Sequence, residues 1–398
     1  MRILALADCI PFPPIGGGEL RTYHLLRAMA ARHDVTLVGF TTNDGPTSPS
    51  FPVRVIPVPW DWPPLYQEML FGDTAVSQAA YEQLEYGSDV PWYANWAQSD
   101  LMVDTLRRLA RETFDLVLIE HSYMAGLLPV LPPGVPRVLD LVDVHARMVQ
   151  RSLEGSCGDE GERASRDAEK TIRFERWAAS QCACCLAVSE NEAAAARTLL
   201  GIERVAVVAN GVDTSFFSAG EHQPVSGYLL FTGTMNYGPN IEAVQYFVSE
   251  ILPEIQRHTA SAQLHVVGTK PTEQVMGLAS EGVIIHGQVP DMRPYYRDAS
   301  VVVVPVLRGG GTRLKILEAA ACAKPIVSTS LGAEGLRFAN GRDLLIADSA
   351  REFADHVVQV ARDRALQERL GRSARQASQA YDWESIGSQL CRVVEGLL

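Results

Sequence analysis

Short apolar runs, separated by segments of helical periodicity, recur along the whole chain of 398 residues. Unbroken runs of Val, Ile and Leu are typical of parallel strands buried on both faces. The first half holds RILALAD (2–8), DVTLVGF (34–40), FPVRVIPV (51–58), FDLVLIE (114–120), RVLDLVD (137–143), CCLAVSE (184–190) and RVAVVAN (204–210), and the second holds GYLLFTG (227–233), QLHVVGT (263–269), GVIIHGQ (282–288), VVVVPVL (301–307), PIVSTS (325–330) and DLLIAD (343–348). Each half is therefore predicted to be a doubly wound α/β unit.

The length of the chain predicts two domains, since a single core of this size would be unusual. We expect the first domain over residues 1–210 and the second over 227–380. Residues 211–226 are rich in turn formers and show no period, which is typical of a linker. A helix is expected at about 382–397, within the segment 381–398, and we expect it to pack back on the first domain.

Composition excludes several classes of protein. The net charge of −12 argues against a nucleic-acid partner. No segment has the roughly 20 apolar residues of a membrane helix, and the opening MRILALADCIPF is better interpreted as a strand than as a signal peptide. We expect a cytoplasmic protein with reduced cysteines, for which peripheral association with the inner membrane face is the most that the sequence allows. Cys182, Cys184 and Cys185 are interpreted as buried cysteines, because no second pair lies at metal-ligand spacing.

Residues 60–100 interrupt the first domain with an aromatic-rich helical insertion. Four of the six tryptophans lie there: Trp60, Trp62, Trp92 and Trp96. One interpretation is an insertion packed on the sheet. The other is an aromatic wall that faces a bulky partner. The sequence leaves both open.

The segment RGGGTRLKILEAAACAKPIV (308–327) follows the most apolar strand candidate. Ligands of open parallel sheets bind beyond the carboxyl ends of strands, and glycines there allow backbone N–H groups to point at an anion. A helix is expected to start near Thr312, with Gly311, Lys315 and Glu318 on one face. Glu318 would lie about 10 Å along the axis from Gly311, close to the span from a diphosphate to a ribose. The alternative is a glycine cap with a surface ion pair, which fits poorly inside so apolar a helix.

The chain also resembles a known family. The ordered segments GTMNYGPN (233–240), VVG (266–268), GQVPDMRPYY (287–296), PVLRGGGTRLKILEAAACAKPIVST (305–329) and GAEGL (332–336) are similar to the donor half of a family-4 glycosyltransferase of the GT-B fold. In the first half, IGGGELRTYHLL (15–26), FDLVLIEHS (114–122), and SENEAAAARTLLG (189–201) with VVANGVDTSFF (207–217) agree more weakly. The resemblance implies two Rossmann-like domains that face a central cleft, and it is strongest to the branch associated with bacterial exopolysaccharide synthesis.

The resemblance implies a role for particular residues. Glu318 would bind the nucleotide ribose, and Arg313 and Lys315 would lie near the diphosphate as catalytic cations. The backbone at Val289 would contact the nucleobase, and His121 would lie beside the donor sugar and acceptor as a catalytic residue. The remaining donor-binding positions are Gly17, Gly18, Gly233, Gly310, Gly311 and Thr312.

This sequence departs from the family pattern at three points. Gly310 replaces the first Glu of the Glu–seven residues–Glu motif, so that contact with the sugar is absent or made by backbone. The Arg and Lys that many relatives carry after the first strand of the donor half are missing. Arg313 and Lys315 are therefore the residues expected to provide positive charge near the diphosphate. His121 follows Glu120 instead of a second His, so a structural role at the strand end is an alternative.

The resemblance implies retaining transfer of a sugar from a nucleoside diphosphate sugar, with UDP favoured over GDP or dTDP, to a hydroxyl of a glycan, lipid-linked or small-molecule acceptor. No cofactor and no metal are expected, because the donor loop carries no Asp-x-Asp. A nicotinamide enzyme is excluded, since IGGGELRT lacks the G-x-G-x-x-G spacing. A nucleotide-sugar epimerase or phosphorylase and an inactive nucleotide-binding subunit remain as alternatives.

Overall fold

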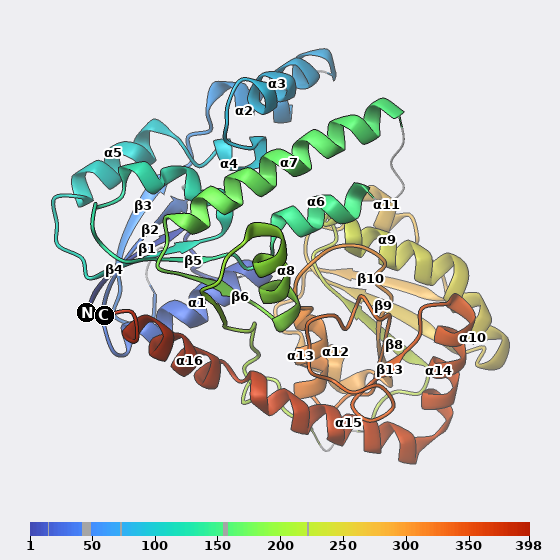
Figure 1. Ribbon diagram of the computed structural model, residues 1–398. Coiled ribbons are helices and arrows are strands. Elements are labelled where there is room, and N and C mark those ends of the chain that lie inside the picture. Colours follow the sequence, from blue (N-terminus) through green and yellow to red (C-terminus); the bar gives the residue numbers. More distant parts are fainter. Residues whose placement is uncertain (15, 42–48, 72–73, 154–157, 221–222) are drawn as a thin grey trace. The chain divides into compact units, whose positions relative to one another are not determined.

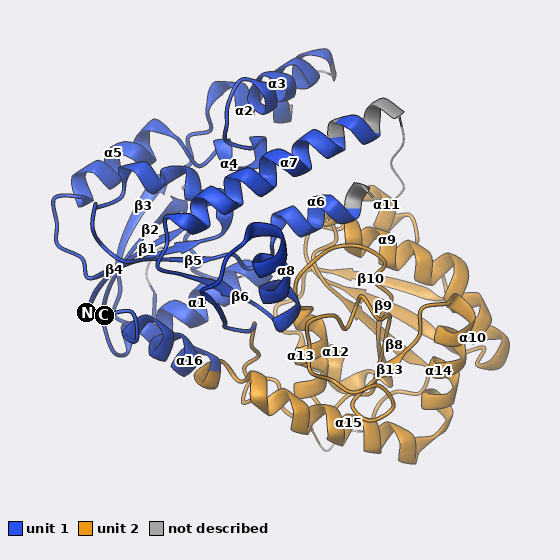
Figure 2. Ribbon diagram, in the orientation of Figure 1, with its two compact units in different colours: residues 1–209, 386–398 blue, residues 210–385 orange. Residues whose placement is uncertain are grey.

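The computed structural model describes residues 1–14, 16–41, 49–71, 74–153, 158–220 and 223–398 (Figure 1). The chain forms two compact units, which Figure 2 shows in different colours. Unit 1 comprises Met1–Ala209 and Ile386–Leu398, and unit 2 comprises Asn210–Ser385. The segment 211–226 lies within unit 2.

Unit 1 contains a seven-stranded sheet in the order β3-β2-β1-β4-β5-β6-β7. Its strands are β1 (Arg2–Ala7), β2 (Asp34–Thr41), β3 (Arg54–Pro59), β4 (Leu116–Glu120), β5 (Arg137–Asp140), β6 (Cys184–Ala187) and β7 (Val205–Val207). Every pairing is parallel. All seven strands fall within the predicted apolar runs or extend one residue past them, because only such runs can be covered by helices on both faces.

The helices of unit 1 connect successive strands. They are α1 (Gly17–Ala30), α2 (Pro64–Phe71), α3 (Thr74–Tyr86), α4 (Trp92–Asn95), α5 (Asp100–Leu109), the 3₁₀ segment η1 (Ser122–Val130), α6 (His145–Leu153), α7 (Gly158–Ser180) and α8 (Glu190–Leu200). Local sequence sets their ends. Ser99 and Ser189 accept from the backbone N–H groups of Met102 and Glu192 as N-caps, and Gly201 ends α8 in the left-handed conformation.

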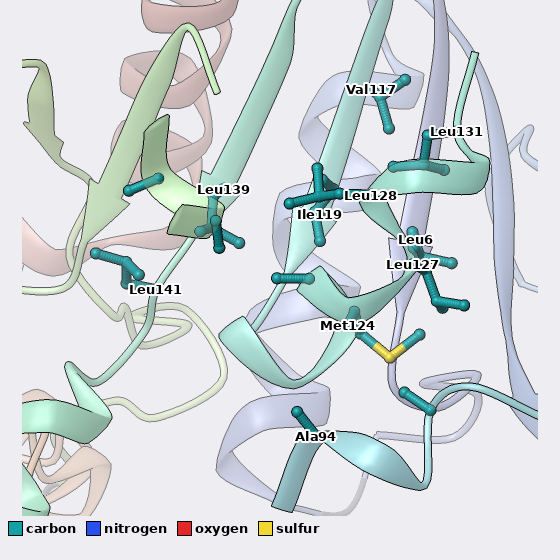
Figure 3. Packing of buried hydrophobic residues seen from close by; sticks show 14 of the residues in the cluster. Leu6, Ala94, Val117, Ile119, Met124, Leu127, Leu128, Leu131, Leu139 and Leu141 are labelled. Atoms are coloured by element: carbon teal, nitrogen blue, oxygen red, sulfur yellow. The ribbon is translucent and has the colours of Figure 1, made fainter. Parts of the chain in front are cut away.

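One hydrophobic cluster of unit 1 joins the sheet to the segment 122–131 and to helices α4, α5, α7 and α8. Val117 and Ile119 from β4 and Leu139 from β5 are fully buried, and Figure 3 shows them in this cluster together with Met124 and Leu128 of η1. Burial of such side chains contributes roughly 1.5–3 kcal/mol each. The core therefore fixes the strand ends from which the polar side chains project.

The insertion packs against this core. Trp60 stacks on Trp96 with ring centroids 5.2 Å apart and an interplanar angle of 12°, and Phe40 of β2 lies 5.1 Å from Trp60. Both tryptophans are partly buried against the core cluster. These contacts support the interpretation of a helical insertion packed on the sheet.

Unit 2 contains a six-stranded parallel sheet in the order β10-β9-β8-β11-β12-β13. Its strands are β8 (Tyr228–Thr232), β9 (Gln263–Val267), β10 (Val283–Gly287), β11 (Val301–Val304), β12 (Ile326–Ser328) and β13 (Leu345–Ile346). The six predicted apolar runs correspond to these six strands. The run DLLIAD forms only two residues of strand, β13, which pairs with β12 alone.

The helices of unit 2 are α9 (Gly238–Tyr246), the π-helical η2 (Phe247–Ile251), α10 (Leu252–His258), α11 (Glu273–Met276), α12 (Arg293–Asp298), α13 (Leu314–Ala321), α14 (Ala350–Arg362), α15 (Arg364–Ser378) and η3 (Gln379–Tyr381). The last helix, α16 (Trp383–Glu395), runs into unit 1 from Ile386 onward. There Cys391 Sγ donates to the Ala28 carbonyl, and Glu395 pairs with Arg32 at 3.1 Å. The C-terminal end of the chain is thus part of the first unit.

In the described segments, no helix is both long enough and apolar enough to span a lipid bilayer. The described cysteines are all free thiols, and Cys184 and Cys185 are buried in β6. The described residues also hold no group of three or more His, Cys, Asp or Glu side chains that could bind a metal ion. Of the three clustered cysteines predicted to be buried, Cys184 and Cys185 are buried, whereas Cys182 is partly exposed.

Candidate functional site

The strand order of unit 2 reverses between β8 and β11, since β9 follows on one side of β8 and β11 lies on the other. At such a switch point the loops leave the sheet in opposite directions, and a ligand can enter between them. Gly233 directly follows β8, and the glycine loop 309–311 follows β11. The predicted donor-binding residues of the second half therefore collect at the edge where the fold favours a ligand.

The glycine loop takes the backbone conformation that its sequence suggested. Gly309 and Gly311 have φ of 105° and 70°, which other residues adopt only at a cost. The expected start of the helix near Thr312 is wrong, because α13 begins at Leu314 and Arg313 is its extended N-cap residue. The left-handed turn at Gly311 delays helical geometry by two residues. Arg313 therefore belongs to the loop, where its guanidinium donates to the Gly311 carbonyl at 2.8 Å.

Lys315 is a buried cation in the first turn of α13. It is 8% exposed, its Nζ donates to Asn240 Oδ1 at 2.9 Å, and the ammonium lies 4.0 Å from the Phe231 ring centroid. Burial, followed by the charge of Arg313, lowers the pKa of Lys315 to about 7. Two of its three N–H groups have no acceptor among the described residues, so the ammonium can receive an anion.

Gly233 lies directly against this ammonium. It has φ of 153°, and a Cβ at this position would approach Lys315 Nζ to 3.0 Å and Asn240 Nδ2 to 2.8 Å. A side chain at 233 would displace Lys315. Glycine is therefore required at position 233 for two reasons: the backbone has a positive φ, and Lys315 lies where a side chain would be.

Glu318 lies one turn further along α13. Its Oε2 accepts from the Tyr296 hydroxyl at 2.6 Å, and the same hydroxyl lies 3.0 Å from Thr232 Oγ1. Burial raises the pKa of Glu318 above its ordinary value, although Tyr296 and Lys315 oppose this shift. The other oxygen, Oε1, makes no hydrogen bond to a described residue. Glu318 can therefore accept from a ligand hydroxyl while Tyr296 fixes its orientation.

The remaining predicted residues of unit 2 have defined places. Thr312 is buried, and its hydroxyl accepts from Asn210 Nδ2 at 2.9 Å. Gly310 is buried in the loop, and Val289 is partly buried in the segment after β10. The sequence did not single out Asn240, Phe231, Tyr296 or Thr232, although Asn240 lies within GTMNYGPN and Tyr296 ends GQVPDMRPYY, both of which carried the family resemblance.

The corresponding switch point of unit 1 lies between β1 and β4. His121 directly follows β4 and has φ of 61°, a conformation that costs a non-glycine residue roughly 1–3 kcal/mol. Its ring stacks on Tyr123 with centroids 4.8 Å apart. A Cβ on Gly18 would lie 3.7 Å from His121 Nε2, so the glycine start of α1 leaves this nitrogen uncrowded. The structure thus brings Gly17, Gly18 and His121 to one edge of unit 1.

Buried charges surround this edge. Arg21 of α1 forms two hydrogen bonds with Asp140 at the end of β5, at 2.8 and 3.0 Å, and both side chains are almost fully buried. Neighbouring Glu120 is also buried, and burial together with Asp8 and Asp140 raises its pKa well above the ordinary value. The sequence prediction missed these residues, whose signal was a charged side chain within an otherwise apolar strand or helix face.

His145, the first residue of α6, has a structural environment. Its ring stacks on Tyr93 at 4.8 Å, and burial lowers its pKa to about 3. Glu175 accepts from the backbone N–H groups of His145 and Ala146, which satisfies the N-terminus of α6. A histidine that stays neutral in this way is a poor proton carrier at neutral pH.

Comparisons with known proteins agree with this geometry. The family model described as Glycosyltransferase Family 4 matches residues 15–216, and the model described as Glycosyl transferases group 1 matches residues 226–363. The phosphatidyl-myo-inositol mannosyltransferase of Mycobacterium leprae is 30% identical over 154 residues, which cover 37% of this chain and 41% of that protein. The chain thus matches less than half the length of this curated relative.

Solved structures cover the chain more completely. Sucrose-phosphate synthase from Thermosynechococcus elongatus has a TM-score of 0.75 at 18% identity, covering 100% of this chain and 99% of its own. Anabaena HepE in complex with UDP and glucose has a TM-score of 0.68 at 15% identity, covering 99% of both chains. These likenesses show the GT-B fold. Since the first family model matches just over half of the sequence, the chain belongs to Glycosyltransferase Family 4.

Proposed function

We propose that this protein is a retaining glycosyltransferase that moves a sugar from a nucleoside diphosphate sugar to a hydroxyl acceptor. The observation that carries the proposal is the pair Lys315 and Glu318 on α13, beside the glycine loop at the switch point of unit 2. The cation has two N–H groups available for phosphate, and the carboxylate has one oxygen available for a ribose hydroxyl. Family membership and the UDP complex of the fold relative HepE support a nucleotide sugar, with UDP favoured.

In the proposed reaction, the bond between the anomeric carbon and the diphosphate breaks while the acceptor oxygen bonds to the same face of the sugar. The acceptor hydroxyl passes its proton to the departing diphosphate oxygen, on which negative charge develops as its bond to the sugar breaks. Lys315 and Arg313 would stabilise that charge together with the backbone of the glycine loop, which is preorganised and partly buried. These groups supply the stabilisation that a metal ion provides in other transferases, so we propose a reaction without a metal requirement.

His121 is the catalytic candidate of unit 1. Its strained backbone, its position at the carboxyl edge of β4 and the uncrowded Nε2 beside Gly18 support contact with substrate. The acceptor is proposed to be a glycan, a lipid-linked sugar or a small molecule in bacterial polysaccharide or glycoconjugate synthesis. The mycobacterial relative is named for mannosyl transfer to phosphatidyl-myo-inositol, a lipid, which supports a lipid-linked acceptor among these.

The test is a calorimetric titration of the full chain with UDP, GDP and dTDP, followed by their sugars. Glu318→Gln keeps the size of the side chain and removes a charge-assisted bond worth about 1.5–3 kcal/mol, so affinity should fall roughly ten- to a hundredfold. A 2′,3′-dideoxy nucleotide should lose as much on the native protein and little more on the variant. Equal affinity of native and variant protein for the nucleotide would contradict the proposed ribose contact.

A second candidate function is a nucleotide-binding subunit without transferase activity. The observation that favours it is Gly310, which stands where the family has the first Glu of its motif. A binding subunit would hold nucleotide without transferring the sugar and without slowly hydrolysing the donor. An epimerase would instead convert the nucleotide sugar in the absence of any acceptor.

A further inference from the structure

Unit 2 contains a cavity of about 490 Å³ that is separate from the glycine loop. Its floor includes Ala299, which precedes β11, and Lys324 and Pro325, which precede β12. Because these strands are parallel, the cavity opens at their amino ends, whereas the glycine loop follows the carboxyl end of β11. The volume is within the range of small-molecule sites, which is roughly 300–1,000 Å³.

The lining is cationic in a chain whose net charge is −12. Its charged side chains are Arg293, Arg297, Lys324, Arg364 and Arg372, with Asp291 and Glu368 as the lining carboxylates. Asp291 pairs with Arg293 at 2.8 Å, and Asp298, just outside the lining, pairs with Arg297 at 2.9 Å. The lining arginines of α15 lie on one helix face together with Glu368, at positions four residues apart. Arg364 and Arg372 share this single carboxylate, at 2.7 and 3.6 Å. The cavity therefore carries more positive charge than its own acids neutralise.

Lys324 places a buried cation at the floor. It is 8% exposed, and its Nζ donates to the carbonyls of Arg297 at 2.6 Å and Ala299 at 3.1 Å. Its third N–H has no acceptor in the part of the chain that the structure describes. Burial lowers the pKa of Lys324 to about 8; the charges of Cys322 and Asp298 oppose this shift, and those of Arg364 and Arg297 add to it. An anion in the cavity could accept the third N–H.

The backbone is strained where it presents this lysine. Ala323 has φ of 54°, in the left-handed region that costs a residue with a side chain roughly 1–2 kcal/mol. The strain turns the chain out of α13 so that Lys324 reaches the C-terminal carbonyl groups of α12. The cation is thus held in place before any ligand binds.

From the excess of arginines, the available N–H of Lys324 and the size of the cavity, we propose that this is a second site, which binds a small phosphorylated molecule. Guanidinium groups bind phosphate through two parallel hydrogen bonds, and an ammonium adds a point charge. A nucleic acid would need an extended basic surface, which a single concave site in an acidic chain does not provide. The site is independent of the donor site proposed above.

The test is calorimetry of the full chain with inorganic pyrophosphate at low ionic strength, with glucose as the uncharged control. Lys315→Met removes the main cation of the glycine loop, and one pyrophosphate site should remain in this variant. Adding Arg297→Gln and Arg372→Gln, whose side chains are 50% and 71% exposed, should then weaken binding at least about tenfold. Arg369→Gln is the matched control, because Arg369 lies on the same helix but instead donates to the Gly341 carbonyl.

Loss of all pyrophosphate binding in Lys315→Met would overturn the proposal, since the glycine loop would then be the sole site. Unchanged affinity after the two arginine substitutions would overturn it as well. If Arg369→Gln weakens pyrophosphate binding as much as the two arginine substitutions do, the effect comes from general surface charge, and the proposal is overturned. Binding in the cavity without any nucleotide binding would keep this proposal and contradict only the donor site.

Discussion

Replacing Lys315 by Met should stabilise the unliganded protein at pH 7 and change its stability little at pH 9.5. The pKa of Lys315 falls from the ordinary 10.5 to about 7 in the folded protein. The unfolded chain therefore binds more protons than the folded one between pH 7 and pH 10.5, and the free energy of unfolding rises with pH across this window. The destabilisation caused by the lysine is largest at pH 7 and below.

The magnitude follows from the two pKa values. Lys315 costs roughly 4 kcal/mol of folding free energy at pH 7 and roughly 1 kcal/mol at pH 9.5. Methionine removes this cost together with the hydrogen bond to Asn240 and the cation–π contact with Phe231, which contribute about 2–3 kcal/mol in total while the lysine is charged. At pH 9.5 the lysine is neutral, and only a neutral hydrogen bond of about 1 kcal/mol is lost. The variant should therefore gain about 1–2 kcal/mol at pH 7 and change little at pH 9.5.

Differential scanning calorimetry at both pH values measures this effect. Each kcal/mol should move the melting temperature of a unit of this size by roughly 2–4 °C. Arg308→Met is the control, because Arg308 is exposed and paired with Glu242, its charge does not contribute to the pKa shift of Lys315, and arginine does not titrate in this range, so its shift should be the same at both pH values. A Lys315→Met variant that melts lower by the same amount at pH 7 and pH 9.5 would show that the folded protein does not lower the pKa of Lys315 and that our inference from its burial is wrong.

Three further outcomes follow from the site. Transfer should survive EDTA, since the described residues place cations instead of a carboxylate cluster at the glycine loop; activity lost in EDTA and restored by Mg²⁺ or Mn²⁺ would contradict this expectation. His121→Ala should lower kcat far more than it weakens nucleoside diphosphate binding, whereas unchanged turnover would leave His121 a structural residue. An isolated fragment of residues 210–385 should bind nucleoside diphosphate as the full chain does, because Lys315, Glu318 and their partners all lie in unit 2; binding by the full chain alone would refute this.

The sequence by itself determined the strands, the two α/β halves and the charged segment after the most apolar strand. These features depend on local pattern. An unbroken Val run such as 301–304 is stable only between two helical layers, and the glycines at 309 and 311 mark the left-handed turn that follows. The helix start was misplaced by two residues because the extent of that turn depends on φ and ψ, which periodicity does not encode.

Only the tertiary structure decided which groups surround those charges. Asn240 is 75 residues from Lys315, Tyr296 is 22 from Glu318, and Asp140 is 119 from Arg21. Such pairs form because the strand order β9-β8-β11 and its counterpart in unit 1 bring distant strand ends together, and no local pattern carries that order. The pKa shifts of Lys315, Glu318 and Glu120 also depend on the tertiary structure, since burial in the folded protein is their largest cause. The sequence therefore supplied the charged residues, and the fold determined their protonation and their partners.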